Sequence, residues 1–264
     1  MTDLPVLISR PGGRAGPLAS AIEARGLPVM RLEVMHLEAL PETPAMRSIW
    51  LDIDHFHQVV VVSPFAAECL AHALDRYWPQ LPVGIAFYAV GASTAALLHR
   101  QLGVRVHVPS PSAGEDTSEA LLQLASLHDL DERRVLLVAG EGGRSLIADT
   151  LAARGASVTR LAVYRRRLLS PDTAMQARLS AGVYRALVVS SGEILEHLAR
   201  WCSDTALNQP LIVSSARLAT LADRLGFRFP VVASGATPAA LADAVARSSA
   251  PEEADVDHDD LEKG

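Results

Sequence analysis

The residues best suited to chemistry stand in six short segments rich in Ser, Thr, Gly and Arg, each directly after an apolar run: residues 10–14, 63–64, 91–94, 140–144, 190–192 and 214–217. Hydroxyl groups, the backbone N–H groups of glycine turns and guanidinium groups all donate hydrogen bonds to anions. None of the segments holds an obvious pair of nucleophile and base. A single Ser in such a turn is most simply a helix cap. Their agreement favours a ligand with several negative charges, held between two domains.

Lysine is nearly absent from the chain, because the 24 basic residues are 23 Arg and one Lys, Lys263. Schiff-base catalysis, pyridoxal-phosphate chemistry and a Walker-type phosphate loop each need a lysine inside the fold, so these classes are excluded. Residues 248–264 hold seven acidic residues and that lysine, which accounts for the formal net charge of −6. We expect this tail to be disordered and dispensable for activity. The neutral body does not fit a nucleic-acid-binding protein.

Three other patterns are weaker. Gly140, Gly142 and Ser145 are spaced like a dinucleotide-binding turn, but the acidic residue expected on the next strand is missing from residues 158–164. Residues 52–57 (DIDHFH) contain possible metal ligands, although a solvated loop is the simpler interpretation. A Ser-His-Asp triad is disfavoured, because GxSxG is absent and only His197, on a predicted helix, stands near a candidate Ser turn.

The strands and helices that carry these turns can be predicted from an internal repeat. Residues 6–35 and 135–164 share eleven of thirty positions at a constant offset of 129 without a gap. Each copy predicts a strand, a glycine-rich turn, an amphipathic helix that stops at Ala-Arg-Gly, and a second strand. Residues 59–72 resemble residues 187–200, and residues 89–104 resemble residues 212–227.

Buried strands that alternate with helices in this way predict an α/β fold of two similar, doubly wound parallel sheets. Further strands are expected at residues 104–108, 158–164 and 231–233. In parallel sheets ligands bind beyond the carboxyl ends of the strands, where helices begin, and all six polar turns occupy such places.

The subcellular location is predicted from sequence features that are absent. No apolar run reaches the roughly 18 residues of a membrane span, and the first residues do not read as a signal peptide. Cys69 and Cys202 lie far apart in helix-like stretches, which predicts free, buried thiols. We therefore expect a cytoplasmic protein.

The ordered set of motifs resembles the uroporphyrinogen-III synthase family over residues 4–247. The matching segments are VLISRP (6–11), VxSPxAAE (61–68), AVGxxTAxxL (89–98), VLLVAGEGGRSLIADTLAARGAxVxxLxVYRR (135–166), VSSxEILEHL (189–198) and SSARLAxLAxRLGF (214–227). The glycine-rich GEGGR with VYRR downstream is the most specific part. The sequence departs from the family pattern at Val62, Phe65 and Ala139, which weakens individual polar contacts.

The resemblance implies two flavodoxin-like lobes with interrupted sequences. One lobe would hold residues 1–35 and 168–247, and the other residues 39–162. Residues 34–38 and 162–168 would form a two-stranded connector. The two copies of the repeat would then lie in opposite lobes.

The resemblance also implies a hydro-lyase of tetrapyrrole (heme) biosynthesis that acts as a monomer. Such an enzyme cyclises hydroxymethylbilane, a linear tetrapyrrole with eight carboxylates, expels the terminal hydroxyl and inverts ring D through a spiro intermediate. No metal or organic cofactor is implied, and neither is a nucleic-acid or membrane partner. The substrate also cyclises by itself, to the wrong isomer, so the enzyme mainly controls conformation.

Site residues carry over onto matching positions of this sequence. Tyr164, the tyrosine of VYRR, is the candidate general acid, since a phenol can donate a proton to a leaving hydroxyl; its alternative role is a packed aromatic. The expected substrate-binding residues are Arg10, Ser63, Gly91, Ser93, Thr94, Gly142, Gly143, Arg144, Ser190, Ser191, Ser214 and Ser215.

Two rival functions stay open at this point. A non-catalytic, two-lobed receptor for a multiply anionic small molecule would share the same turns, although its usual extracytoplasmic form would need a signal peptide. An α/β enzyme acting on nucleotides or sugar phosphates is disfavoured by the missing core lysine and by the missing ribose-binding acid.

Overall fold

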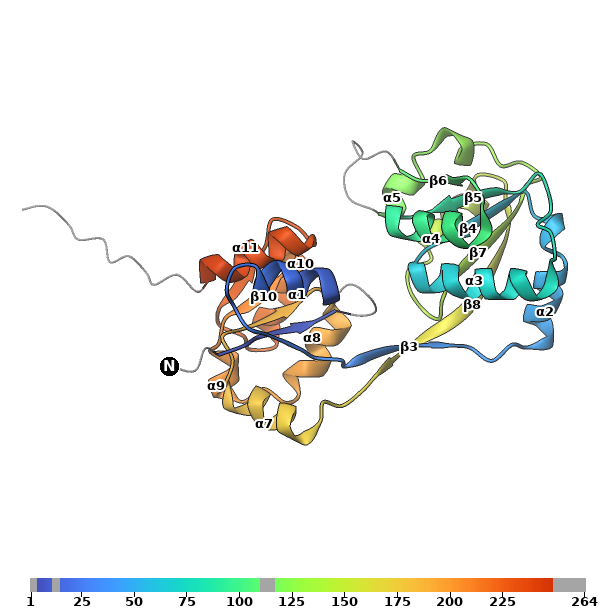
Figure 1. Cartoon of the computed structure of the whole chain (residues 1–264). Coiled ribbons are helices and arrows are strands. Elements are labelled where there is room, and N and C mark those ends of the chain that lie inside the picture. The colour runs from blue at the N-terminus through green and yellow to red at the C-terminus, as the bar shows by residue number, and fades with distance from the viewer. Residues whose placement is uncertain (1–3, 11–14, 110–116, 249–264) are drawn as a thin grey trace, which may run out of the picture. The chain divides into compact units, whose positions relative to one another are not determined.

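The structure, a computed structural model, describes residues 4–10, 15–109 and 117–248. Contacts divide the chain into two compact units (Figure 1). The first unit combines Met1–His36 with Leu168–Gly264, and the second holds Leu37–Arg167. The turn residues 11–14 and the expected tail from residue 249 onward lie outside the described residues. Ser248, the first residue assigned to that tail, is instead the last residue of a helix.

The first unit contains a five-stranded sheet in the order β11-β10-β9-β1-β2. All of its pairings are parallel. The three central strands are fully buried and, apart from Ser9, apolar, as expected for a sheet covered on both faces. The strand bounds are β1 Val6–Ser9, β2 Val29–Arg31, β9 Ala186–Val189, β10 Leu211–Val213 and β11 Pro230–Val232.

Helices cover both faces of this sheet. On one face α1 (Ala15–Glu23) and α11 (Pro238–Ser248) share a core that contains Leu18 and Leu241. On the other face the core contains side chains of α7 (Thr173–Ala181), α8 (Gly192–Ala199) and α10 (Ala216–Arg224), among them Leu195 and Leu218. The short α9 (Asp204–Leu207) precedes β10.

The second unit contains a six-stranded sheet in the order β3-β8-β7-β4-β5-β6. Its strands are β3 (Met35–Ala39), β4 (Gln58–Val61), β5 (Ala86–Ala89), β6 (Val106–His107), β7 (Arg134–Gly140) and β8 (Ser157–Leu168). One core packs against α2 (Pro44–Leu51), α3 (Pro64–Tyr77) and α4 (Ala92–Leu102). The opposite core packs against α5 (Ser118–Leu121) and α6 (Leu146–Ala153). The unit boundary falls within β3 and β8.

The two sheets repeat one strand order. Read from one edge, the first is β2-β1-β9-β10-β11 and the second, inside β3, is β8-β7-β4-β5-β6. The repeated segments occupy equivalent places, since β1 and β2 correspond to β7 and β8, β9 to β4, and β10 to β5. The order of the first sheet is the flavodoxin-like 2-1-3-4-5. The predicted fold class, two similar doubly wound parallel sheets, is confirmed.

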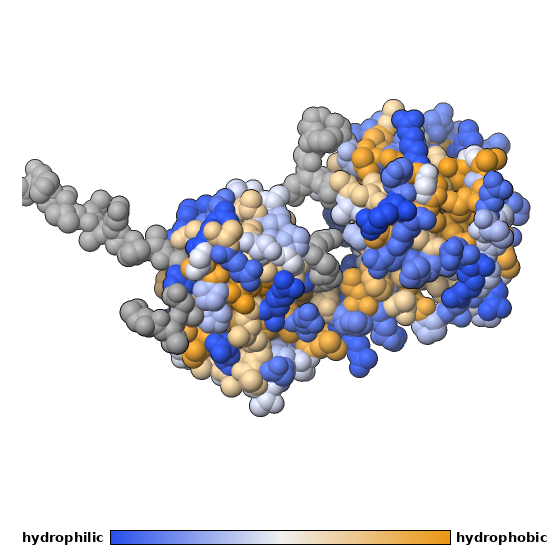
Figure 2. All heavy atoms as spheres, in the orientation of Figure 1, coloured by the Kyte–Doolittle hydropathy of each residue, from blue (hydrophilic) through white to orange (hydrophobic). Residues whose placement is uncertain are grey.

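The surface has an ordinary distribution of apolar residues. On the face in Figure 2, hydrophilic and hydrophobic residues are interspersed over both units. Large hydrophobic side chains are exposed at scattered positions such as Leu51, Val83 and Phe229. Within the described ranges, no helix combines the length and the apolar character that a membrane crossing needs.

Both cysteines are free, as the sequence predicts, but each is only partly buried. Burial raises the pKa of the Cys69 thiol to about 11, with a smaller contribution from the carboxylate of Glu68. Burial likewise raises the pKa of the Cys202 thiol to about 11. Thiols with such pKa values stay protonated at neutral pH and are poor nucleophiles.

The predicted glycine stop of the second repeat copy is confirmed at α6. The N–H of Gly155 donates to the carbonyl of Ala152 (3.0 Å), and the N–H of Ala156 donates to that of Leu151 (3.1 Å). This is the Schellman arrangement, in which the residue after the helix adopts a left-handed conformation. Gly155 has φ of +92°, and a Cβ atom there would lie 3.1 Å from Cα of Asp131 and closer still to its carboxylate.

We expect Gly155→Ala to destabilise the second unit by about 2–4 kcal/mol, because it adds a steric contact to left-handed strain worth about 1–2 kcal/mol. Gly84→Ala is the matched control, since Gly84 has φ of +90° with open space around its Cβ position in the same unit. It should show the strain alone. Urea unfolding followed by circular dichroism measures both, and equal losses would contradict the contact with Asp131.

Candidate functional site

In both sheets the polar turns collect at a topological switch point. The helix after β1 covers one face of the first sheet, while the helix after the neighbouring β9 covers the other. In the second sheet, α6 after β7 and α3 after β4 diverge in the same way. Such points, at the carboxyl edge of the strands, are where doubly wound sheets bind ligands.

Tyr164 lies at the switch point of the second sheet because β8 contains an irregularity there. Ala139 pairs with Ala162, but the next residue of β7, Gly140, pairs with Tyr164. Val163 is therefore an extra residue, as in a β-bulge. In a regular strand Val163 and Tyr164 would point to opposite faces, yet both belong to the core cluster beneath α3. The bulge thus turns Tyr164 toward the start of α3.

The ring and the hydroxyl of Tyr164 are both held. A Cβ atom on Gly140 would lie 2.7 Å from the ring carbon that carries the hydroxyl, so only glycine allows this packing. The Phe65 ring meets the Tyr164 ring edge to face, with centroids 5.2 Å apart. Ser63 donates a hydrogen bond from its Oγ to the Tyr164 hydroxyl oxygen (3.1 Å). The phenol is 3% exposed and has a fixed orientation.

Ser63 has two tasks in this arrangement. It is the N-cap of α3, where its Oγ accepts a hydrogen bond from the N–H of Ala66 (3.2 Å), and it contacts Tyr164. The helix-cap interpretation of this serine is confirmed, and the cap does not prevent its contact with Tyr164.

The turn after β5 lies beside that of β4. Gly91 is the N-cap of α4 in an extended conformation, Ser93 is exposed and Thr94 is buried. The start of α4 presents backbone N–H groups at the same sheet edge as the start of α3.

The turn after β7 is built from two glycines with positive φ, Gly142 (+69°) and Gly143 (+80°). Arg144, next in the chain, is exposed and donates to the carboxylate of Glu119 (2.6 Å). A backbone hydrogen bond, helped by Arg144, lowers the pKa of Glu119 below its usual value. Arg144 is thus engaged by an acid on α5.

In the first unit, Arg10 connects the turns at the sheet edge. Its Nε donates to Ser190 Oγ after β9 (3.2 Å), and its Nη2 donates to the carbonyl of Ala236 after β11 (3.0 Å). Ser191 begins α8 without a side-chain cap bond, whereas Ser215 caps α10 by accepting from the N–H of Leu218 (3.4 Å). The structure therefore brings Arg10, Ser190, Ser191, Ser214 and Ser215 to neighbouring turns of one sheet.

Two features at the sheet edges were missed from the sequence. One is the turn before α11, where Thr237 Oγ1 accepts from the N–H of Ala240 (3.2 Å); the Thr-Pro pair at residues 237–238 is a helix-start signal. The other is Arg160, which donates to the carbonyl of Gly142. Its only sequence signal is the identity with Arg31 in the repeat.

The possible metal ligands among residues 52–57 make other contacts within the protein. Asp52 precedes a single 3-10 turn that ends at His55, and the two side chains form an exposed pair (3.9 Å). His57 Nδ1 accepts a hydrogen bond from the N–H of Arg134 (3.1 Å). In the part of the chain that the structure describes, no group of three or more His, Cys, Asp and Glu side chains could hold a metal ion.

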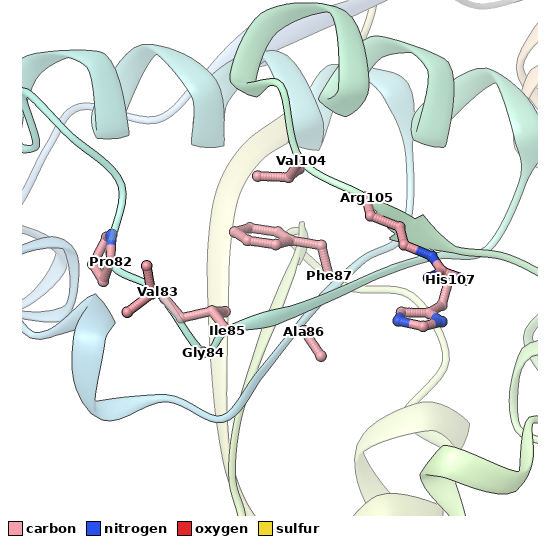
Figure 3. Close-up of a pocket in the computed structure, with 9 residues that line it drawn as sticks. All are labelled: Pro82, Val83, Gly84, Ile85, Ala86, Phe87, Val104, Arg105 and His107. Carbon is pink, nitrogen blue, oxygen red and sulfur yellow. The ribbon is translucent and has the colours of Figure 1, made fainter.

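An open groove of about 460 Å³ lies elsewhere in the second unit, at the amino-terminal end of β5 (Figure 3). Its lining is mostly apolar, with Phe87, Val104, Arg105 and His107 among the residues. Because parallel strands share their direction, this groove and the polar turns occupy opposite edges of the sheet. None of the residues expected to bind substrate lines it.

Comparisons with known proteins agree with this geometry. The family model described as uroporphyrinogen-III synthase HemD matches residues 16–243. Uroporphyrinogen-III synthase of Escherichia coli is 33% identical over 245 residues, covering 89% of this chain and 97% of the relative. The Salmonella typhimurium protein of the same name is 34% identical over 243 residues, with the same coverage of 89% and 97%.

Solved structures show the same fold. The uroporphyrinogen-III synthetase of Helicobacter pylori has a TM-score of 0.59 at 14% identity, covering 92% of this chain and 100% of that one. A mutant uroporphyrinogen III synthase of Thermus thermophilus has a TM-score of 0.58 at 20% identity, covering 92% and 98%. The chain belongs to the uroporphyrinogen-III synthase family.

Proposed function

We propose that this protein is a uroporphyrinogen-III synthase, which converts hydroxymethylbilane into uroporphyrinogen III with loss of water and inversion of ring D. The observation that carries the proposal is the Tyr164–Ser63 pair at the switch point of the second sheet, in a chain of this family. The pair supplies a buried, oriented proton donor. That suits a reaction in which a hydroxyl leaves and no covalent enzyme intermediate is needed.

Tyr164 is proposed to protonate the leaving hydroxyl. In the proposed mechanism Ser63 is the donor to the phenol oxygen, which leaves the proton of Tyr164 available to another acceptor. The same hydrogen bond stabilises the phenolate that forms when the proton is transferred, since bonds to charged acceptors are the stronger ones. The contacts of Gly140 and Phe65 with the ring fix the direction of transfer.

In each unit, the carboxyl edge of the sheet is proposed as a place where a carboxylate of the substrate can bind. The starts of α3, α4, α8 and α10 offer unsatisfied N–H groups and a positive partial charge. Ser63, Gly91, Ser93, Thr94, Ser191, Ser214 and Ser215 stand at these starts. Anion binding of this kind needs no net positive charge, in keeping with a body in which Arg and acidic residues balance.

A non-catalytic receptor for a multiply anionic molecule would use the same turns. The family match favours the enzyme, because the matched relatives are named uroporphyrinogen-III synthases, whereas the phenol by itself could also donate a hydrogen bond to the carboxylate of a bound ligand.

The main test supplies hydroxymethylbilane to the purified protein and separates the uroporphyrin isomers after oxidation. We expect isomer III, formed far faster than spontaneous cyclisation. Isomer I alone, at the spontaneous rate, would contradict the proposed function, and tight binding without acceleration would favour the receptor.

For the role of Tyr164, we expect Tyr164→Phe to lower kcat by about 100-fold or more, the scale of general acid catalysis, with the fold kept. The control is Tyr77→Phe, which removes a hydroxyl that donates to Glu42 (2.6 Å) away from the site. Single-turnover kinetics and melting curves measure both variants. Near-normal turnover of Tyr164→Phe would leave Tyr164 a packing residue only.

The proposal also describes a cytoplasmic monomer that needs neither metal nor organic cofactor. We expect dialysis against EDTA to leave kcat and KM unchanged, and light scattering to give the mass of one chain, 28.1 kDa. Activity that is lost on dialysis and restored by a divalent cation would overturn this part of the proposal.

A further inference from the structure

Strand β8 fixes three successive residues of the β7–α6 turn. The ring of Tyr164 packs against Gly140, and the carbonyl of Tyr164 accepts a hydrogen bond from the N–H of Glu141 (2.7 Å). The guanidinium of Arg160 donates to the carbonyl of Gly142. One strand therefore orients both the candidate acid and the glycine turn beside it.

Arg160 and Tyr164 reach this turn from opposite faces of the sheet. Leu161 and Val163 belong to the core beneath α3, so the alternation of a strand places Val158 and Arg160 on the face covered by α6. The irregularity at Val163 then returns Tyr164 to the α3 face. The turn is thus held from both sides.

The bond from Arg160 has a consequence for the next N–H group. The carbonyl of Gly142 and the N–H of Gly143 belong to one planar trans peptide, in which the two groups point in opposite directions. Two successive glycines give the turn wide conformational freedom, so the orientation of this peptide must be set by a contact. Holding the carbonyl toward Arg160 directs the N–H of Gly143 away from it.

That N–H group has no acceptor in the described part of the chain. We propose that Arg160 is a positioning residue that fixes the Gly142–Gly143 peptide, so that the N–H of Gly143 donates to a substrate carboxylate. The inference rests on the proposed function and adds to it a residue that orients the binding turn. Arg160 itself need not touch the substrate.

The test compares Arg160→Met, Arg160→Lys and the control Arg100→Met, which removes an exposed arginine from the last turn of α4. We expect Arg160→Met to raise KM for hydroxymethylbilane by about 10-fold with kcat changed less than about 3-fold. A raised KM with little change in kcat indicates the loss of a contact that binds the substrate and the transition state equally well. It should also raise the share of isomer I, because a loosened substrate escapes control. Arg100→Met should keep the KM of the wild type.

Arg160→Lys separates orientation from charge. A lysine keeps the charge but not the planar fork, so we expect only partial recovery of KM. Full recovery by lysine, with a KM defect of Arg160→Met that vanishes at high salt, would show attraction by charge and overturn the positioning role. Wild-type KM and isomer ratio in Arg160→Met would overturn it as well.

Failure of the inference and failure of the proposed function remain distinguishable. If the wild-type protein produces no isomer III, the function fails before any variant is compared. If the wild type produces isomer III and Arg160→Met behaves like it, only the role of Arg160 fails. Melting curves of each variant separate a lost fold from a changed turn.

Discussion

Parallel strand pairing is the constraint on which the site depends. Parallel strands end at one edge, so the turns after β4, β5 and β7 must be neighbours, as must those after β1, β9 and β10. Helices then leave two adjacent strands on opposite faces of the sheet, and the starts of those helices diverge. Residues far apart in the chain, such as Ser63 and Tyr164, meet for this reason.

The arginines at the sheet edges bind the protein itself. Arg10 holds Ser190 and Ala236, Arg144 is paired with Glu119, and Arg160 holds Gly142. On the proposed function, these contacts orient N–H and hydroxyl groups that would bind the carboxylates of the substrate. Preorganised dipoles of this kind do not have to rearrange when the charge distribution changes during a reaction, which free surface charges must do.

The sequence was sufficient for the fold class and for the places of the turns, because the repeat and its apolar runs depend on local pattern. The sequence could not predict the contact between Tyr164 and Ser63. A regular strand would point Tyr164 to the other face, and the register shift at Gly140 arises only when β7 and β8 pair. The partners of Arg144 and Arg160 could not be predicted either. An arginine side chain can bind an anion, an acidic side chain or a carbonyl, and tertiary packing decides which of these it contacts.

Both units of the duplicated fold contain polar turns at the sheet edge, but only the second unit has a tyrosine there. Both switch points are bridged by a side-chain hydrogen bond, from Arg10 to Ser190 in the first unit and from Ser63 to Tyr164 in the second. The repeat aligns Tyr164 with Met35, which cannot donate a proton. On the proposed mechanism the second unit therefore carries the acid, whereas the turns of the first unit offer hydrogen-bond donors alone. One acid is sufficient for a reaction in which the enzyme mainly controls the conformation of the substrate. Such a reaction needs many fixed hydrogen-bond donors, and only one of its steps needs a proton.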